Sequence, residues 1–388
     1  MKVAIIDPGG FTMPYDHHLC TSLSNQGIDT TFLTIRQSRI YWHNKKYNRI
    51  DHFYRLSSRL FTKSLKIQMC LKGIEHFGDM ARLLKHLRQC KPDIIHFQWL
   101  CLAMIDVFFL KRMQQIAALV LTVHDSQPYQ GSPSSIFQLL SYRKAIETFR
   151  QLIVHTDYSK NKLIDETGVR PDKVTVIPFG SIKYQRPKEN LTLSDLDIRR
   201  PKQILFFGFI KSYKGLDILI EAFSMLPKDV LETACLQIKG YPKMSVKPLV
   251  NLVTKLNLAA KVKWDLRFIS EEEVFKAFQE ADIVVLPYTR IDQSAVLMTA
   301  WGFNKPVIAT RIGGFREIIK DRINGLLVEP GNRENLRDAL HEMISNPELI
   351  TNIREEIRSQ QKQSLSWHGI AIKTINLYNR IAKEELKS

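Results

Sequence analysis

The stretch "QILFFGFIKSYKGLDILIEAFSML", residues 203–226, contains the transition that decides the fold. An apolar run ends at Gly208, a short loop carries Lys211 and Lys214, and Gly215 opens an amphipathic helical pattern. A strand that leads through a glycine-containing loop into a helix is the building unit of a parallel sheet covered by helices. The loop resembles a phosphate cradle, although its spacing is not that of a P-loop, and a solvated loop with two exposed lysines is the alternative interpretation.

The same alternation runs through the whole chain in two blocks. Short apolar runs predict strands at residues 2–7, 30–35, 93–98, 118–125, 151–156 and 173–178 in the first block, and at 203–210, 234–240, 261–266, 282–287, 306–310 and 325–330 in the second. Runs that are apolar on both faces, with helical patterns between them, indicate parallel strands buried under helices. The predicted fold class is therefore α/β, with doubly wound sheets and right-handed crossovers.

The length of 388 residues exceeds one ordinary core, so we expect two domains. The polar, proline-punctuated segment 181–201 has no periodic apolar face and is expected to be a linker. It separates an N-terminal Rossmann-like domain, residues 1–180, from a C-terminal one that starts at residue 202. Such domains bind ligands at the carboxyl ends of their sheets, so a ligand in the cleft between them is the first functional expectation.

The net charge of +17 predicts an anionic partner, because 56 basic residues are present with only 39 acidic ones. The excess is concentrated in residues 36–91, which hold fourteen Lys and Arg residues, three acidic residues and interleaved aromatic residues. No recognised nucleic-acid module is present, so nucleic acid is not the expected partner. We hypothesise peripheral binding to the anionic inner face of the cell membrane, and a core helix with a solvated charged face is the equal alternative. The helical stripe in question consists of Leu56, Leu60, Ile67 and Leu71.

Several expected absences narrow the possible functions. Five cysteines without metal or redox spacing are expected to be reduced thiols of a cytoplasmic protein. The apolar runs at the N-terminus and at residues 100–110 are too short for a signal peptide or a membrane span. A dinucleotide fingerprint, a metal cluster and a serine elbow are all missing from the sequence, which weakens dehydrogenase, metallohydrolase and serine-hydrolase interpretations.

A second candidate anion site follows the strand expected at residues 282–287, where a helix begins at Ser294. Serine is a favoured N-cap residue, and the first amides of the helix, at Ala295 and Val296, would be free to hold an anion. Ordinary capping without a ligand is the alternative interpretation, and the two are compatible.

The N-terminal block offers two more candidates. Gly9 and Gly10 follow the first strand, where paired glycines let main-chain amides approach a phosphate, although a plain turn would look the same. His124 ends a strand, the place where a doubly wound sheet presents ligand-binding groups, although a lone histidine is more often a packing residue. His96 and His155 also end strands, and we expect them to be structural.

The ordered set of motifs resembles the group-1 nucleotide-sugar glycosyltransferases, sequence family 4. The C-terminal block carries "FFGFIKSYKGLDILIEAF", "ADIVVLPY" and "NKPVIATRIGGFREIIKDRINGLLVEPGN", and the N-terminal block carries "DIIHFQW", "LTVHD", "VHTDYSKNKL" and "KVTVIPFG". The resemblance implies the GT-B fold, in which two Rossmann-like domains face a deep cleft. It implies a donor-binding C-terminal domain over residues 202–365, an acceptor-binding N-terminal domain, and a final helix, residues 366–388, that crosses back to the N-terminal domain.

The resemblance also implies an activity. It is the metal-independent transfer of a sugar from a UDP- or GDP-linked donor to a glycan or lipid-linked acceptor, with retention of configuration and without a cofactor, in envelope polysaccharide or lipopolysaccharide biosynthesis. Family positions make His124 and Lys214 the catalytic residues. Donor contacts are expected from Gly9, Gly10, Gly208, Lys211, Lys214, Ser294, Ala295, Val296 and Thr299.

The chain departs from the family pattern at three positions. Two glutamates of many members are replaced here by Ile291 and Thr299, and an arginine after the strand-end glycine is replaced by Phe209. A threonine hydroxyl bonds a ribose less strongly than a carboxylate does. We expect Lys211 to stand in for the arginine, and lysines and helix-start amides to stabilise the leaving diphosphate. A catalytically inactive partner subunit and a GT-B sugar-nucleotide epimerase are the alternatives.

Overall fold

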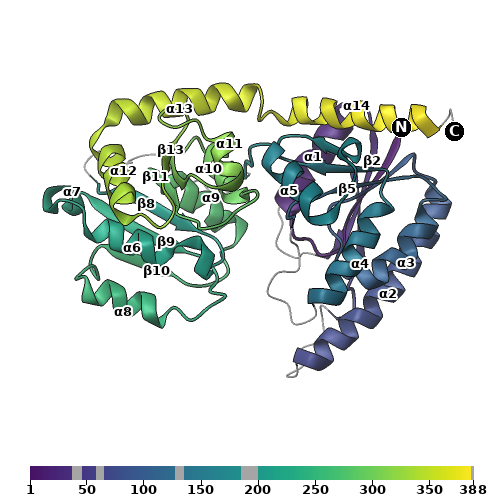
Figure 1. Cartoon of the computed structure of the whole chain (residues 1–388), viewed down its shortest axis with the longest axis horizontal. Coiled ribbons are helices and arrows are strands. Elements are labelled where there is room, and N and C mark those ends of the chain that lie inside the picture. The colour runs from purple at the N-terminus through teal and green to yellow at the C-terminus, as the bar shows by residue number, and fades with distance from the viewer. Residues whose placement is uncertain (37–45, 58–64, 127–134, 185–199, 386–388) are drawn as a thin grey trace. The chain divides into compact units, whose positions relative to one another are not determined.

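The computed structural model describes residues 1–36, 46–57, 65–126, 135–184 and 200–385. The chain divides into two compact units, the first formed by Met1–Phe179 with Trp367–Ser388 and the second by Gly180–Ser366. In each unit a parallel sheet lies between layers of helices (Figure 1). Of the expected linker, residues 185–199 lie outside the described residues.

The first unit is built on a seven-stranded parallel sheet with the order β3-β2-β1-β4-β5-β6-β7. Its strands are β1 (Lys2–Asp7), β2 (Asp29–Ile35), β3 (Asn48–Phe53), β4 (Ile94–Phe97), β5 (Ala118–Thr122), β6 (Gln151–Val154) and β7 (Val174–Val176). Its helices are α1 (Met13–Asn25), α2 (Leu65–Cys90), α3 (Ala103–Met113), α4 (Ser135–Glu147), α5 (Asp157–Thr167) and α14 (Trp367–Glu385). Every residue of β4, β5 and β6 is buried, because helices cover both faces of the sheet.

The second unit repeats this plan with a six-stranded parallel sheet of order β10-β9-β8-β11-β12-β13. Its strands are β8 (Lys202–Phe207), β9 (Ala234–Lys239), β10 (Val262–Asp265), β11 (Ile283–Leu286), β12 (Val307–Thr310) and β13 (Leu326–Val328). Its helices are α6 (Leu216–Ser224), α7 (Lys228–Glu232), α8 (Lys247–Lys255), α9 (Glu271–Glu280), α10 (Ala295–Gly302), α11 (Gly313–Ile318), α12 (Arg333–Ser345) and α13 (Pro347–Lys362). A capping box formed by Ser270 and Glu273 starts α9.

The strand orders confirm the doubly wound α/β fold predicted from the sequence. In each sheet the order reverses between two central strands, β1 and β4 in the first unit and β8 and β11 in the second. Ligands of such sheets bind beyond the carboxyl ends of these strands. The loops that follow β1 and β4, and those that follow β8 and β11, are therefore the places to search for a site.

The basic segment of the first unit differs from the expectation. Residues 48–53 form the edge strand β3, whose half-buried polar residues gave no clear strand pattern. Leu56 lies in a turn before α2, so the expected stripe does not form the face of a single helix. Leu60 lies outside the described residues, as does the side chain of Ile67.

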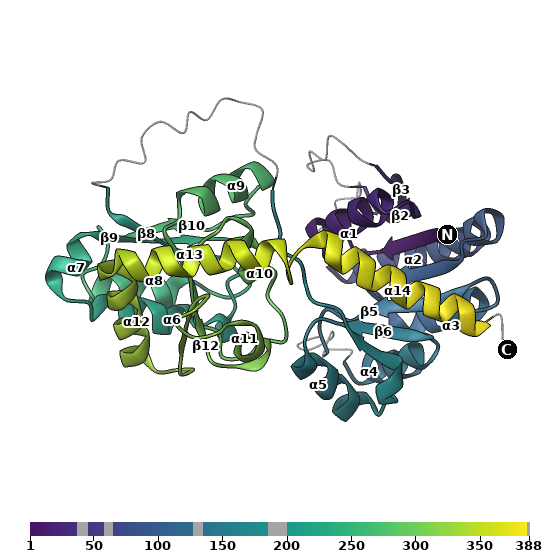
Figure 2. The ribbon, with the colours of Figure 1, turned by 90° about the horizontal axis from the view of Figure 1, so that it is seen from above.

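The last helix belongs to the first unit, where α14 packs against α1 (Figure 2). Tyr378 of α14 is fully buried, and its hydroxyl lies 2.6 Å from Nδ1 of His96. Trp367 stacks on His18 with ring centroids 5.3 Å apart. None of the described helices combines the length and the apolar character needed to cross a membrane.

Candidate functional site

Lys214 is a buried cation of the second unit. It ends a short 3-10 turn, Ser212–Lys214, and only 7% of its surface is exposed. Its Nζ donates a hydrogen bond to the Tyr288 hydroxyl at 3.1 Å and lies 4.8 Å from the centroid of that ring. Burial lowers the pKa of Lys214 to about 8, so the protein holds an ammonium group that has lost most of its water.

Two glycines make this arrangement possible. Gly215 has a φ of 63°, and a Cβ there would lie 2.1 Å from the Pro287 carbonyl oxygen, so only glycine lets the loop pass the end of β11. Gly208 has a φ of 107°, and a Cβ there would lie 3.0 Å from Lys214 Nζ and 3.6 Å from a methyl group of Val296. The Gly208 amide itself donates to the Lys239 carbonyl, so this glycine provides space for a ligand and for Lys214 but no free donor.

The start of α10 supplies free donors next to this lysine. Ser294 is the N-cap, and its hydroxyl accepts from the amide of Leu297 at 3.3 Å. In the described part of the chain, the amides of Ala295 and Val296 have no protein acceptor, and Ala295 is exposed. A methyl group of Val296 and Nζ of Lys214 both lie next to Gly208, so the first turn of α10 and the ammonium group border the same small space. An anion fits such a space.

Thr299 is less available than expected. Its hydroxyl donates to the Ala295 carbonyl one helical turn earlier, at 2.8 Å, and the residue is 5% exposed. The oxygen keeps lone pairs that can accept a hydrogen bond from a ribose hydroxyl, but its own proton is already used.

Two further cations lie near this site: Lys211, which the sequence singled out, and Arg290, which it did not. Arg290 and Lys211 lie over the ring of Tyr213 at 5.1 and 5.7 Å, and that ring lies edge-on to Tyr288 at 6.3 Å. These positive charges therefore gather around an aromatic pair that also contacts Lys214. Their positions after β8 and β11 were the available sequence signal.

Phe209, which stands in place of a family arginine, is 48% exposed and has a cation next to it. The Nζ of Lys243 lies 5.3 Å from the centroid of the Phe209 ring. Lys243 comes from the segment after β9, and its amide donates to the Ile210 carbonyl, which fixes the backbone there. The sequence alone does not reveal this neighbour, because 33 positions of chain separate the two residues.

In the first unit, the loop after β1 does not offer the amides expected from the sequence. Gly9 and Gly10 donate to Oδ1 of Asp7 at 3.1 and 2.9 Å, and Thr12 donates to Oδ2 at 3.3 Å. The expectation that free amides of Gly9 and Gly10 hold a phosphate therefore needs correction, because the carboxyl group of the same loop occupies them. Burial raises the pKa of Asp7, and burial together with Asp7 raises the pKa of Asp16 well above its usual value.

His124 lies half-buried at the end of β5, among aromatic rings. Its ring stacks on Trp99 at 5.3 Å and meets the edge of Tyr15 at 4.9 Å. Its Nε2 lies 3.1 Å from Gln98 Oε1, and its Nδ1 lies 3.2 Å from His155 Nε2. Burial, followed by the proximity of His155, lowers the pKa of His124 well below the usual range of histidine, so its ring is neutral at pH 7.

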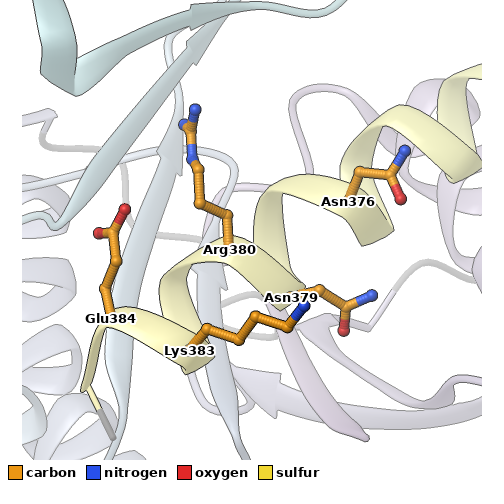
Figure 3. Close-up of a pocket in the computed structure, with 5 residues that line it drawn as sticks. All are labelled: Asn376, Asn379, Arg380, Lys383 and Glu384. Carbon is orange, nitrogen blue, oxygen red and sulfur yellow. The ribbon is translucent and has the colours of Figure 1, made fainter. Parts of the chain in front are cut away.

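A separate surface hollow of about 480 Å³ lies along α14 and contains none of these residues (Figure 3). It is lined by Asn376, Asn379, Arg380, Lys383 and Glu384, of which Glu384 pairs with Arg150. Among the described residues, no group of three His, Cys, Asp or Glu side chains is placed to hold a metal ion. The candidate donor site is thus the group formed by Lys214, Gly208 and the start of α10.

Comparison with known proteins matches both units to one family. The family model of group 1 glycosyl transferases matches residues 194–360, and that of glycosyltransferase family 4 matches residues 15–180. The chain is similar to an uncharacterised glycosyltransferase of Methanocaldococcus jannaschii, with 32% identity over 79% of this chain and 80% of that protein. Lys214 and His124 lie within these matched regions.

Solved structures agree with the fold. The HepE protein of Anabaena, solved in complex with UDP and glucose, superposes with a TM-score of 0.74 and 18% identity over 98% of this chain and 100% of that one. WaaG, a glycosyltransferase involved in lipopolysaccharide biosynthesis, has a TM-score of 0.64 and 16% identity over 97% and 99% of the two chains. With two doubly wound units, this likeness identifies the GT-B fold. The relative, the two family models and the motifs agree, and the chain belongs to the group-1, family-4 glycosyltransferases.

Proposed function

We propose that this protein is a retaining, metal-independent glycosyltransferase that moves a sugar from a nucleotide diphosphate donor to a glycan or lipid-linked acceptor. The observation that carries the proposal is the pairing of a buried lysine with unoccupied helix-start amides around Gly208. A diphosphate matches both partners, because it brings negative charge to the ammonium group and acceptor oxygens to the amides. UDP is the first nucleotide to test, because HepE has been solved with it.

The chemistry assigned to these residues is stabilisation of a leaving group. As the bond between the sugar carbon and the diphosphate oxygen breaks, its electron pair stays on the oxygen, and Lys214 and the amides of Ala295 and Val296 face that charge. Fixed donors of this kind stabilise a developing charge without reorganisation. The acceptor hydroxyl then bonds to the sugar carbon on the face that the diphosphate leaves, and its proton passes to the departing diphosphate oxygen. No protein nucleophile and no cofactor take part.

A screen of UDP- and GDP-sugars tests this proposal. We expect the purified protein to hydrolyse or transfer the sugar of at least one of them, and Lys214→Ala to abolish that turnover. Lys305→Ala is the matched control, because Lys305 is a partly buried lysine whose Nζ donates to the Gln279 carbonyl at 2.8 Å. Turnover that survives in a folded Lys214→Ala protein would overturn the assignment.

A lipid-linked acceptor would place the protein at a membrane surface, and an exposed apolar patch supports this part of the proposal. Ile74 and Phe77 on α2 and Met104 and Phe108 on α3 are 73%, 49%, 56% and 46% exposed. Phe77 and Phe108 stack at 6.2 Å, and the Arg112 guanidinium lies 3.8 Å from the Phe108 ring centroid. Apolar side chains with basic neighbours bind the boundary region of anionic membranes.

Vesicle sedimentation tests the patch. We expect binding to vesicles that contain anionic phosphatidylglycerol and little binding to neutral phosphatidylcholine vesicles, because both charge and apolar burial contribute. Ile74→Ser with Phe77→Ser should reduce binding while the thermal melting temperature stays close to that of the wild type. Binding of wild type and variant to the same extent would rule out this surface. An envelope polysaccharide or lipopolysaccharide pathway is the setting we propose for such an acceptor.

An inactive partner subunit remains a second candidate because of a specific observation. The family's glutamate positions hold Ile291 and Thr299, and the Thr299 hydroxyl already donates to its own helix. Calorimetry separates the two functions, because a catalytic donor site binds a nucleoside diphosphate. A protein that binds neither UDP nor GDP would favour the inactive subunit.

A further inference from the structure

A continuous line of hydrogen-bonded groups crosses the first unit through His124. His155 Nδ1 lies 2.9 Å from the Ile177 carbonyl oxygen, and His155 Nε2 lies 3.2 Å from His124 Nδ1. The line continues from His124 Nε2 to Gln98 at 3.1 Å, and from Gln98 to His96 Nε2 at 3.4 Å. His96 then contacts the hydroxyls of Thr122 and Tyr378.

One end of this line has a fixed direction. The carbonyl oxygen of Ile177 can only accept, so His155 must carry a proton on Nδ1. A neutral His155 then has a bare Nε2, which accepts the proton of His124 Nδ1. A neutral His124 in turn has a bare Nε2. The direction of each hydrogen bond therefore follows from the backbone carbonyl of Ile177.

The other end of the line accepts this direction. As placed, Gln98 has Oε1 toward His124 Nε2 and Nε2 toward His96. A bare His124 Nε2 needs a donor, so the direction set by Ile177 requires the opposite orientation of the Gln98 amide, with its nitrogen toward His124 and its oxygen toward His96. His96 Nε2 then donates, and His96 Nδ1 accepts from Tyr378. The hydroxyls of Thr122 and Tyr378 can each donate or accept, so this end imposes no direction of its own.

A positively charged histidine pair is the competing arrangement, and the surroundings oppose it. His155 and Gln98 are 4% and 0% exposed, and the rings of Tyr15, Trp99 and Phe179 surround the two histidines. Burial lowers the pKa of His155 to about 4 and that of His96 to about 3. The groups that act on the pKa of His124 are His155 and His96, which both disfavour a charge on it.

We propose that His155 is a positioning residue that holds His124 in the tautomer with a protonated Nδ1 and a bare Nε2. Its importance for catalysis rests on the proposed glycosyltransferase function, for which family positions make His124 a catalytic residue. In this tautomer, Nε2 accepts a hydrogen bond from a sugar or acceptor hydroxyl. A bare Nε2 has no proton to give to a leaving diphosphate. The Gln98 amide donates to Nε2 until a substrate hydroxyl takes over this hydrogen bond.

Nitrogen NMR of the full chain tests this tautomer directly. In protein labelled with ¹⁵N-histidine, two-bond proton–nitrogen spectra distinguish protonated from bare ring nitrogens, and loss of one spin system in His124→Gln assigns that residue among the eleven histidines. At pH 7.5 we expect His124 to show a protonated Nδ1 and a bare Nε2. A protonated Nε2, or protons on both nitrogens, would overturn the proposal.

Two substitutions of His155 separate positioning from packing. His155→Leu removes the acceptor, so His124 should switch its proton to Nε2 and donate to Gln98 Oε1. His155→Gln keeps an acceptor oxygen at the same place and should retain the wild-type tautomer. An unchanged tautomer in a folded His155→Leu protein would contradict the role of His155. If His155→Leu does not fold, the wild-type and His155→Gln spectra still decide.

The test is independent of the proposed function. UDP calorimetry on the same samples reports the donor site of the second unit, and we expect His155→Leu to bind UDP as the wild type does. If the wild type binds no nucleoside diphosphate, the proposed function fails while the tautomer assignment stands on its spectra. If UDP binds and the spectra show the other tautomer, only the positioning role fails.

Discussion

The charge of Lys214 should make nucleotide binding depend on pH just above neutrality. Burial lowers the pKa of this lysine to about 8, so about nine-tenths of it is charged at pH 7 and about one-tenth at pH 9. A diphosphate prefers the charged form, and its own phosphate charge changes mainly near pH 6. The affinity for UDP should therefore fall about tenfold between pH 7 and pH 9, because the competent fraction falls by that factor.

Removing the charge of Lys214 measures how much this side chain contributes to the free energy of UDP binding. Lys214→Met should weaken UDP binding at pH 7 by about 1.5–3 kcal/mol, the usual range for a hydrogen bond to a charged group, and should abolish the pH dependence. Lys305→Met is the control, because burial lowers the pKa of Lys305 to about 8 as well while its ammonium group bonds Gln279. That variant should keep both the affinity and its pH dependence.

Isothermal titration calorimetry at pH 7, 8 and 9, at one ionic strength, measures these effects. The titration of Lys214 does not weaken binding at higher pH by destabilising the fold. The pKa of Lys214 is lower in the native state than in the unfolded chain, so the unfolded chain binds more protons between about pH 8 and 10.5. The contribution of Lys214 to the free energy of unfolding therefore rises with pH. Equal affinities for wild type at pH 7 and 9, or a retained pH dependence in Lys214→Met, would refute the reasoning.

Three further substitutions test other parts of the structure. Gly208→Ala adds a methyl group 3.0 Å from Lys214 Nζ at a positive φ, so UDP binding should weaken and the free energy of unfolding should fall by about 1 kcal/mol, as calorimetry and urea titration would show. Phe209→Arg restores a cation at the donor site and should tighten UDP binding several-fold in the same calorimetry; weaker binding would show that this position does not face the diphosphate. Asp16→Asn removes a buried carboxyl whose pKa is raised in the native state, and whose stabilising contribution is therefore lost as the pH rises above about 4. Urea unfolding should accordingly show Asp16→Asn gaining stability over the wild type at pH 8 relative to pH 4.

The sequence predicted the sheets better than the loops between them. Continuous apolar runs such as β5 and β11 are buried on both faces, so their composition alone identifies them. The edge strand β3 escaped because it pairs on one side and exposes polar residues, which leaves a mixed pattern. The start of α10 after Ser294 was predictable because an N-cap needs a particular side chain at a particular place.

The residues of the candidate site were predictable from the sequence only where their structure depends on neighbours along the chain. The glycines at positions 9 and 10 suggested free amides, but the side chain of Asp7 bends back to occupy them, and no local pattern reveals that choice. The hydrogen-bond partners of His124 come from two other strand ends, each more than twenty residues away along the chain. Their meeting depends on the strand order β4-β5-β6, which pattern reading does not supply.

The place of α14 has a consequence for biosynthesis. The first unit includes Trp367–Ser388, so the ribosome must synthesise the whole of the second unit before the last helix of the first unit can form. Until then His96 lacks its hydrogen bond with Tyr378, and His18 lacks the stacked ring of Trp367. During synthesis, α1 therefore stays uncovered by α14. The first unit begins to be made before the second unit but can complete its fold only after the second unit has been synthesised.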